Sequence, residues 1–320
     1  MSAVVSVVVP THNRRDLLLR LLDSLAAQSV ARDALEIIVV HNYTDDGTEE
    51  AVSEWAQSND VSLCYHRKNY SGPAASRQFG AREASGEYIA FIDDDCVATS
   101  QWLDSALETM VEDAPGHIGL CQGCTTPMPD QTRRFLEKTV NIDHASIYFE
   151  TCNILYRRSV FEEVEGFSPE FLDKFYGEDT DLGWKVVEAG YETRYIEEMQ
   201  VYHEVFHVGV WHWLKEPLFF VHLPYLARKF PAFREHMFYR YFLTLETALF
   251  QGFLIGVIAT PLTLWTLLAT LPYLVQRYRS GKHIPSRIFR VARIVAGLPR
   301  SLLTWFALVR GSVRYRSALL

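Results

Sequence analysis

The 320-residue sequence predicts an α/β fold, in which a mostly parallel sheet carries helices on both faces and an α-helical part follows. Two observations support this prediction. Short β-branched runs alternate with helical patterns as far as Ile92, which is typical of buried parallel strands joined by crossover helices. Beyond about residue 205 the alternation stops, and aromatic, uncharged and basic segments follow in turn.

Each element of the predicted sheet has its own local signal. Strands are expected where apolar and β-branched residues run together, and helices where apolar residues recur at helical spacing. The expected strands are residues 4–9, 36–40, 61–66 and 88–92, and the expected helices are residues 16–27, 48–57 and 74–84. Ligands of such sheets bind beyond the carboxyl ends of the strands, so the residues that follow each strand are candidate site residues.

Charge is divided unevenly along the chain. The net charge is −8, yet residues 276–320 contain ten Lys or Arg and no Asp or Glu, which leaves −18 for the first 275 residues. An acidic body with a basic tail argues against general nucleic-acid binding and favours contact between the tail and an anionic surface. The five cysteines and the lack of a secretory pattern at the amino terminus predict a reducing, cytoplasmic environment.

Two acidic clusters are candidates for chemistry. Asp93, Asp94 and Asp95 follow the fourth predicted strand, where their mutual repulsion would be relieved by a hard divalent cation or, alternatively, by solvent. Glu178 and Asp179 precede an apolar helix, where an acidic residue could equally be a helix cap. The polar turn after the first strand, residues 10–14, could offer donors to a phosphate or could simply cap the next helix.

These segments occur in an order that is typical of one enzyme family. The order is VVVPTHNR, EIIVVHNYTDDGT, NYSGPAASRQFG, EYIAFIDDDC, CNILYRRSVFEEVEGF, GEDTDLGWKVVEAG and VYHE. Over about residues 4–204, the chain therefore resembles the family 2 glycosyltransferases, which have the Rossmann-like GT-A fold. The resemblance implies an inverting, metal-dependent transfer of a sugar from a nucleotide-sugar to an acceptor hydroxyl.

The resemblance also implies roles for individual residues. Those expected to contact the nucleotide-sugar are Pro10, Thr11, Asn13, Arg14, His41, Arg77, Asp93 and Asp94. Those expected to hold Mg²⁺ or Mn²⁺ are Asp93, Asp95 and His203. The catalytic pair is Asp179, the general base, with Glu178 beside it, and the turn expected to shape the acceptor side is Gly166 and Phe167.

Several positions depart from the family pattern. His41 occupies a position where the family usually has an aspartate that reads the base, so the base is not predicted, and Gln78 replaces the more frequent Asn after Arg77. Residues 276–279, QRYR, are similar to the QxxRW signature of processive synthases, but Ser280 replaces the tryptophan, which favours a non-processive enzyme. Residues 121–124 form a CxxC without the second pair expected of a zinc site.

The sequence divides into an expected catalytic domain, residues 1–210, and an expected membrane-associated region, residues 211–320. Residues 247–276 carry no charge and are interrupted by Pro261 and Pro272, and a basic amphipathic segment follows them. We expect a helical hairpin broken near Pro261 or a re-entrant segment, with residues 241–320 contacting the cytoplasmic face of the membrane. The expected acceptor is a lipid-linked or cell-envelope glycan. The alternatives are a nucleotidyltransferase with a similar metal site and a non-catalytic membrane adaptor.

Overall fold

The computed structural model describes residues 4–42, 44–70, 72–113, 115–131, 136–174, 176–281 and 286–320. The chain forms two compact units, Met1–Val208 and Gly209–Leu320. This division lies close to the one expected at residue 210, and the roles assigned to the two parts stay predictions.

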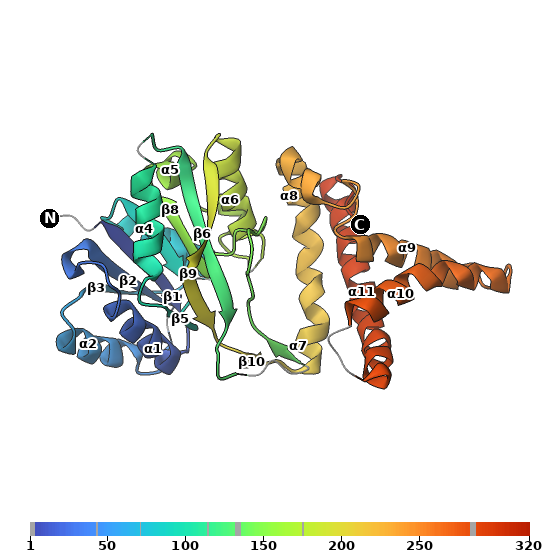
Figure 1. Ribbon diagram of the computed structural model, residues 1–320, viewed down its shortest axis with the longest axis horizontal. Coiled ribbons are helices and arrows are strands. Elements are labelled where there is room, and N and C mark those ends of the chain that lie inside the picture. Colours follow the sequence, from blue (N-terminus) through green and yellow to red (C-terminus); the bar gives the residue numbers. More distant parts are fainter. Residues whose placement is uncertain are drawn as a thin grey trace. The chain divides into compact units, whose positions relative to one another are not determined.

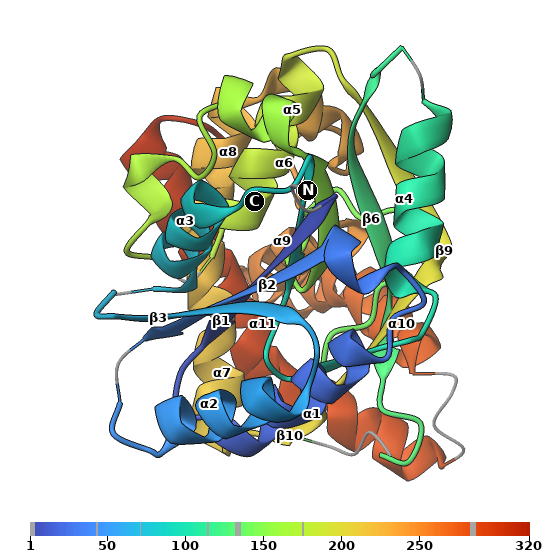
Figure 2. The same ribbon diagram turned by 90° about the vertical axis from the view of Figure 1, so that its left-hand side faces the viewer.

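The first unit is built around an eight-stranded sheet with the strand order β3-β2-β1-β4-β8-β6-β9-β5 (Figures 1 and 2). Its strands are β1 Val5–Thr11, β2 Leu35–Asn42, β3 Ser62–Lys68, β4 Tyr88–Ile92, β5 Cys96–Ala98, β6 Ile118–Pro127, β8 Asn153–Arg157 and β9 Glu192–His203. A small second sheet pairs β7 Glu137–Lys138 with β10 Phe206–His207. The four predicted strands are adjacent and parallel, as expected, whereas β8 runs antiparallel to both β4 and β6.

Helices cover both faces of this sheet, as predicted. They are α1 Arg15–Ala26, α2 Thr48–Ser58, α3 Pro73–Glu83, α4 Trp102–Glu112, α5 Arg158–Glu163 and α6 Glu178–Glu188. Figure 2 shows α3 on one side of β1 and β2, and α1 and α2 on the other. Because both faces of the sheet are covered, β1 is buried along nearly its whole length, and Val7, Val8 and Val9 are apolar in succession instead of alternating with polar residues.

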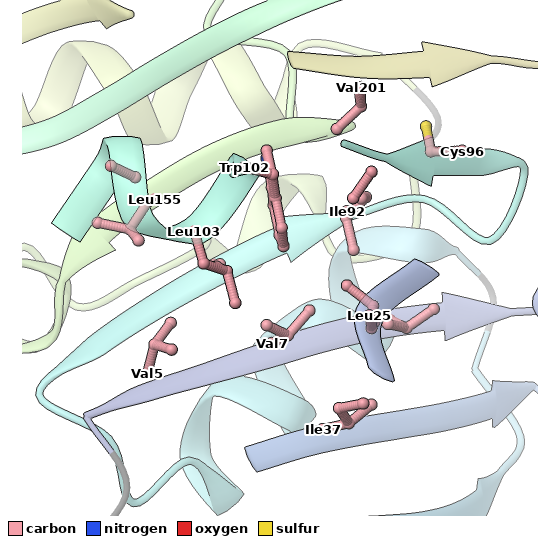
Figure 3. Close-up of a cluster of buried hydrophobic side chains, with 14 of the residues drawn as sticks. Val5, Val7, Leu25, Ile37, Ile92, Cys96, Trp102, Leu103, Leu155 and Val201 are labelled. Atoms are coloured by element: carbon pink, nitrogen blue, oxygen red, sulfur yellow. The ribbon is translucent and has the colours of Figure 1, made fainter. Parts of the chain in front are cut away.

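The main core lies between the sheet and the helices α1 and α4 (Figure 3). Val7 of β1 and Ile37 of β2 belong to this cluster together with Leu25 of α1 and Trp102 of α4. The indole Nε1 of Trp102 donates a hydrogen bond of 2.8 Å to Asn153 Oδ1, which satisfies the polar atom of a buried aromatic side chain.

The first strand is longer than predicted. It continues through Thr11, and Pro10 pairs with Val40 of β2 within the strand, although the sequence places Pro10 in the turn that follows. A proline fits there because β4 pairs with β1 only as far as Val8, so the missing N–H of Pro10 removes no bond on that side.

The second unit is helical. Its helices are α7 Val210–Lys215, η3 Glu216–His222, α8 Leu223–Lys229, η4 Pro231–His236, α9 Leu245–Ile258, η5 Leu264–Thr270, α10 Leu271–Ser280 and α11 Arg287–Tyr315. The expected hairpin near Pro261 is present: α9 ends at Ile258, and the returning chain packs on it, with the rings of Phe253 and Tyr273 centred 5.2 Å apart. Among the described residues, α11 is the one helix long and apolar enough to cross a membrane.

Helix α3, which carries Arg77, packs closely on the sheet through Gly80. A Cβ added at Gly80 would lie 2.4 Å from Cγ1 of Val8. We expect Gly80→Ala to destabilise the protein by about 1 kcal/mol, because overpacking costs about 1–3 kcal/mol and the gain in helix propensity offsets up to about 1 kcal/mol. The midpoint of unfolding in urea measures this loss of stability. Gly252→Ala in α9, whose nearest neighbour would lie at 3.4 Å, is the control and should not lower the midpoint.

Candidate active site

The carboxyl ends of β1 and β4 bring together a hydroxyl, a guanidinium and two carboxylates. Thr11 Oγ1 donates to Asp94 Oδ2 at 2.8 Å, and Arg14 Nη1 donates to Asp94 Oδ1 at 2.9 Å and to Asp95 Oδ2 at 2.6 Å. Burial raises the pKa of Asp94 to about 6, against the opposing attraction of Arg14. Both carboxylate oxygens of Asp94 therefore have protein partners in this arrangement.

Asp95, just before β5, faces a histidine on the neighbouring strand β9. Strand β5 pairs with β9, and this pairing brings His203 Nε2 to 3.4 Å from Asp95 Oδ1, a buried oxygen that lacks a hydrogen-bond partner. His203 Nδ1 lies 2.8 Å from the backbone oxygen of Glu204. Because a carbonyl oxygen can only accept, the neutral ring carries its proton on Nδ1 and turns the lone pair of Nε2 toward Asp95.

Asp95 and His203 offer the donor set of a cation site. With Cys96 they form the single group of three His, Cys, Asp or Glu residues that could hold a metal within the described part of the chain. Burial raises the pKa of the Cys96 thiol well above its ordinary value, so this sulfur is a poor ligand. The buried oxygen of Asp95 and the lone pair of His203 fit a divalent cation. Asp93, the third predicted ligand, is not part of this group.

Asp93 instead meets a guanidinium that joins the two acidic clusters. Arg77 of α3 is buried, and its Nη2 donates to Asp93 Oδ1 at 2.5 Å, while its Nη1 lies 3.9 Å from Asp179 Oδ1. Burial works to lower the pKa of Arg77, but Asp93, Asp179 and Glu178 outweigh it and raise the pKa above the ordinary value. The guanidinium is thus a permanent cation between the end of β4 and the start of α6.

Glu178 and Asp179 begin α6 but have different environments. Asp179 accepts two hydrogen bonds from Thr151, at 3.0 Å from the backbone N–H and at 2.8 Å from Oγ1. Burial raises the pKa of Asp179, while Arg77 and Thr151 oppose that rise by stabilising its charged form. Burial, followed by the charge of Asp179, raises the pKa of Glu178 to about 8. At neutral pH, Glu178 therefore holds a proton, and Asp179 is the better base of the two.

His41 is packed inside the protein. The side chain lies between β2 and β3 with 1% of the residue exposed, its Nδ1 2.6 Å from the hydroxyl of Tyr65 and its Nε2 3.2 Å from Oγ1 of Thr44. Burial lowers its pKa, so the ring is neutral at pH 7. Asn13, by contrast, is exposed in the turn before α1 and has a φ of 58°.

Two residues without a role predicted from the sequence, Thr151 and Gln78, hold other site residues in place by hydrogen bonds. Thr151, just before β8, holds Asp179, and nothing in the local sequence marks it. Gln78, noted as a departure, accepts a hydrogen bond of 2.7 Å from the backbone N–H of Phe167. Gly166 has a φ of 57°, and a Cβ there would lie 2.4 Å from Gln78 Oε1, so this turn and Gln78 fit together closely.

Two family models match the chain. The model described as glycosyl transferase family 2 covers residues 6–165, half of the chain, and the one described as glycosyl transferase family group 2 covers residues 88–307. The chain belongs to glycosyl transferase family 2. Membership in this family favours the glycosyltransferase interpretation over a nucleotidyltransferase or a membrane adaptor.

Named relatives of this glycosyltransferase come from archaea and bacteria. It is 24% identical over 200 residues to the glycosyltransferase AglE of Haloferax volcanii, a match that covers 61% of this chain and 65% of the relative. It is 29% identical over 208 residues to the pre-mycofactocin glycosyltransferase of Mycobacterium tuberculosis, covering 60% and 40% of the two chains. The matches thus span about two fifths to two thirds of these relatives.

Solved structures share the fold. The mannosyltransferase PcManGT of Pyrobaculum calidifontis, solved with GDP-Man and Mn²⁺, superposes with a TM-score of 0.60 at 18% identity over 99% of this chain and 88% of that one. Residues 1–349 of TarS from S. aureus, solved with UDP, superpose with a TM-score of 0.53 at 17% identity over 98% and 92%. The predicted GT-A fold is confirmed.

Thr151 offers a test of how Asp179 is held. We expect Thr151→Val, which removes the hydroxyl but keeps the shape, to lower kcat for glycosyl transfer about tenfold with little change in KM for the donor, because one charge-assisted hydrogen bond is lost. Thr151→Ser keeps the hydroxyl and should restore most of the rate. If Val and Ser variants are equally slow, the Oγ1 hydrogen bond is not what positions Asp179.

Proposed function

We propose that this glycosyltransferase moves a sugar from a nucleotide-sugar to an acceptor hydroxyl and inverts the configuration at the anomeric carbon. The observation that carries the proposal is the meeting of the two acidic clusters at Arg77. A donor-side carboxylate, Asp93, and a base, Asp179, both contact this guanidinium, so both substrates can be held within one site. Structural neighbours solved with GDP-Man or UDP support a nucleotide-sugar donor.

The donor side of the site is assigned to the ends of β1 and β4. Pro10, Thr11, Asn13, Arg14 and Asp94 would border the nucleotide. The cation, Mg²⁺ or Mn²⁺, would be held by Asp95 and His203, with Asp93 as the third predicted ligand, and when bound it would neutralise negative charge on the leaving diphosphate. Arg14 and Arg77 add fixed positive charge to the same edge of the sheet. His41 could contact a base only after giving up a present partner.

Asp179 is assigned as the general base. Its charged form is favoured by Arg77 and by two hydrogen bonds from Thr151, so it can accept the proton of an acceptor hydroxyl within hydrogen-bond reach. Glu178, protonated at neutral pH, adds no second negative charge beside it. Attack from the Asp179 side, with the diphosphate leaving from the opposite side, inverts the anomeric carbon. One sugar is added per encounter, in a non-processive reaction.

The second unit is assigned to the membrane. Its residues 241–320 would contact the cytoplasmic face, which is where nucleotide-sugars are available to the first unit. The basic composition of residues 276–320 and the apolar helix α11 support this location. A site held beside a membrane fits an acceptor that is itself anchored there, so we assign a lipid-linked or cell-envelope glycan as the acceptor.

The assignment of the base predicts a selective loss. Asp179→Asn should lower kcat about a hundredfold or more and leave the donor dissociation constant nearly unchanged, since the proton acceptor is lost and the shape is kept. Steady-state kinetics and donor binding by calorimetry measure the two effects. Glu188→Gln, at the exposed end of the same helix, is the matched control. A parallel loss of donor affinity would assign Asp179 to binding instead.

The cation site predicts a binding defect that can be measured without activity. Asp95→Asn should weaken Mn²⁺ binding at least tenfold, because a charged ligand becomes neutral, and should abolish sugar transfer at ordinary Mn²⁺ concentrations. The Mn²⁺ affinity is measured by titrating the protein with Mn²⁺ and monitoring the free ion by electron paramagnetic resonance. Full transfer activity in EDTA would show that the reaction needs no cation.

A further inference from the structure

Helix α11 exposes a row of apolar side chains along one face. At about 100° per residue, the members of this row lie within about 60° of one another around the helix. They are Ile288, Val291, Val295, Leu302, Phe306 and Val313, and between 47% and 80% of each residue is exposed. We call these six residues the outer stripe. It extends over about 38 Å, at 1.5 Å per residue.

The opposite face of α11 is buried within the second unit. Gly297, Leu308 and Gly311 are buried there, and a Cβ added at Gly311 would lie 2.4 Å from the backbone oxygen of Val221 in η3. The helix is thus apolar on the side that packs and also on the side that faces outward. An exposed apolar face of this extent marks an interaction surface, because soluble surfaces rarely leave one uncovered.

The positions of the arginines in α11 favour a helix that lies in the membrane interface over one that spans the bilayer. Arg287, Arg310 and Arg314 are exposed and lie beside the outer stripe, about 60–100° from its centre. The longest stretch of α11 without a charged residue, 301–309, has nine residues, whereas a bilayer needs about 20 to be spanned. A spanning α11 would bury Arg300 near the centre of the hydrocarbon. A helix lying in the interface places Arg287, Arg310 and Arg314 at the headgroups and leaves Arg300 paired with Glu216 inside the second unit.

The tip of the α9–η5 hairpin has the same chemistry. Leu262, Leu264 and Trp265 are among the most exposed apolar residues, with Leu262 86% exposed. Helix α9 has 14 residues and is about 21 Å long, shorter than the roughly 30 Å hydrocarbon core, so the hairpin can enter one leaflet but cannot cross both. Figure 1 shows α8 and the hairpin on different sides of α11.

We propose that the outer stripe of α11 lies in the plane of an anionic membrane interface, with the hairpin tip dipping into the same leaflet and neither α11 nor the hairpin crossing the bilayer. This deepens the membrane association of the proposed function and rests on it. Residues 276–320 contain ten basic residues and no acidic one, and although Arg277 and Arg300 pair with Glu246 and Glu216, the remaining positive charge is attracted to an anionic leaflet. A second copy of the chain would instead bring its own Arg287, Arg310 and Arg314 next to the same three arginines of the first copy.

Depth measurements test the orientation directly. In a Cys64→Ser background, which removes the exposed native thiol, nitroxide labels are placed singly at Ile288, Leu302, Val313 and Leu262 of the full chain. Accessibility to oxygen and to a polar nickel complex then gives the depth of each label in phosphatidylserine–phosphatidylcholine vesicles. We expect similar, shallow depths at the three α11 positions and a greater depth at Leu262.

Two results would overturn the proposal. A deep label at Leu302 with shallow labels at the two ends means that α11 spans the bilayer. No lipid contact at the three α11 positions means that the stripe binds something else, such as a second copy, which light scattering would detect. Donor hydrolysis by the same labelled proteins measures catalysis independently of lipid binding. A failure of lipid binding is therefore distinguishable from a failure of the proposed reaction.

A pair of substitutions in one helix tests the stripe itself. Phe306→Gln should lower the partition coefficient for anionic vesicles roughly tenfold, since a large apolar side chain leaves the lipid. Phe289→Gln is the control, because Phe289 lies about 120° from the centre of the stripe although it is more exposed than Phe306. An equal or larger loss for Phe289→Gln would contradict the assigned face.

Discussion

The buried guanidinium of Arg77 is the interaction on which the rest of the site depends. Arg77 contacts Asp93 at the end of β4 and approaches Asp179 at the start of α6, two elements far apart in sequence. Without this cation, the buried carboxyl group of Glu178 and the partly buried carboxyl groups of Asp93 and Asp179 would repel one another with no positive charge between them. The close packing of α3 on β1 and β2 at Gly80 fixes the helix that carries Arg77, so sheet packing and site electrostatics are linked.

Local signals were enough to predict the first half of the sheet. Continuous β-branched runs and helical spacing are properties of neighbouring residues, and the four strands and three helices expected up to Ile92 are present with small shifts at their ends. Strands β6, β8 and β9 were not predicted, because they depend on antiparallel and long-range pairing and because β6 contains Gly119, Gly123 and the polar Gln122.

The same reasoning explains what could be predicted of the site. Asp93, Asp95 and Asp179 stood out because carboxylates cluster beside apolar segments. Thr151 could not be found, since its hydroxyl matters only after β8 and α6 come together. In the second unit, the hairpin, the basic tail and a basic amphipathic segment after residue 276 were visible in the sequence. Which side of α11 packs and which is exposed could not be predicted, because the helix is apolar on both faces and packing alone separates them.

The claim that both acidic clusters form one site is tested most directly by a crystal structure. Crystals would be grown with Mn²⁺ and with the nucleoside diphosphate that gives the largest thermal stabilisation, and the anomalous signal would locate the ion. The account predicts an Mn²⁺ peak at ligand distance from Asp95 and His203, with the diphosphate in contact with Arg77. A peak away from Asp95 and His203, or a nucleotide bound without contact to Arg77, would contradict it.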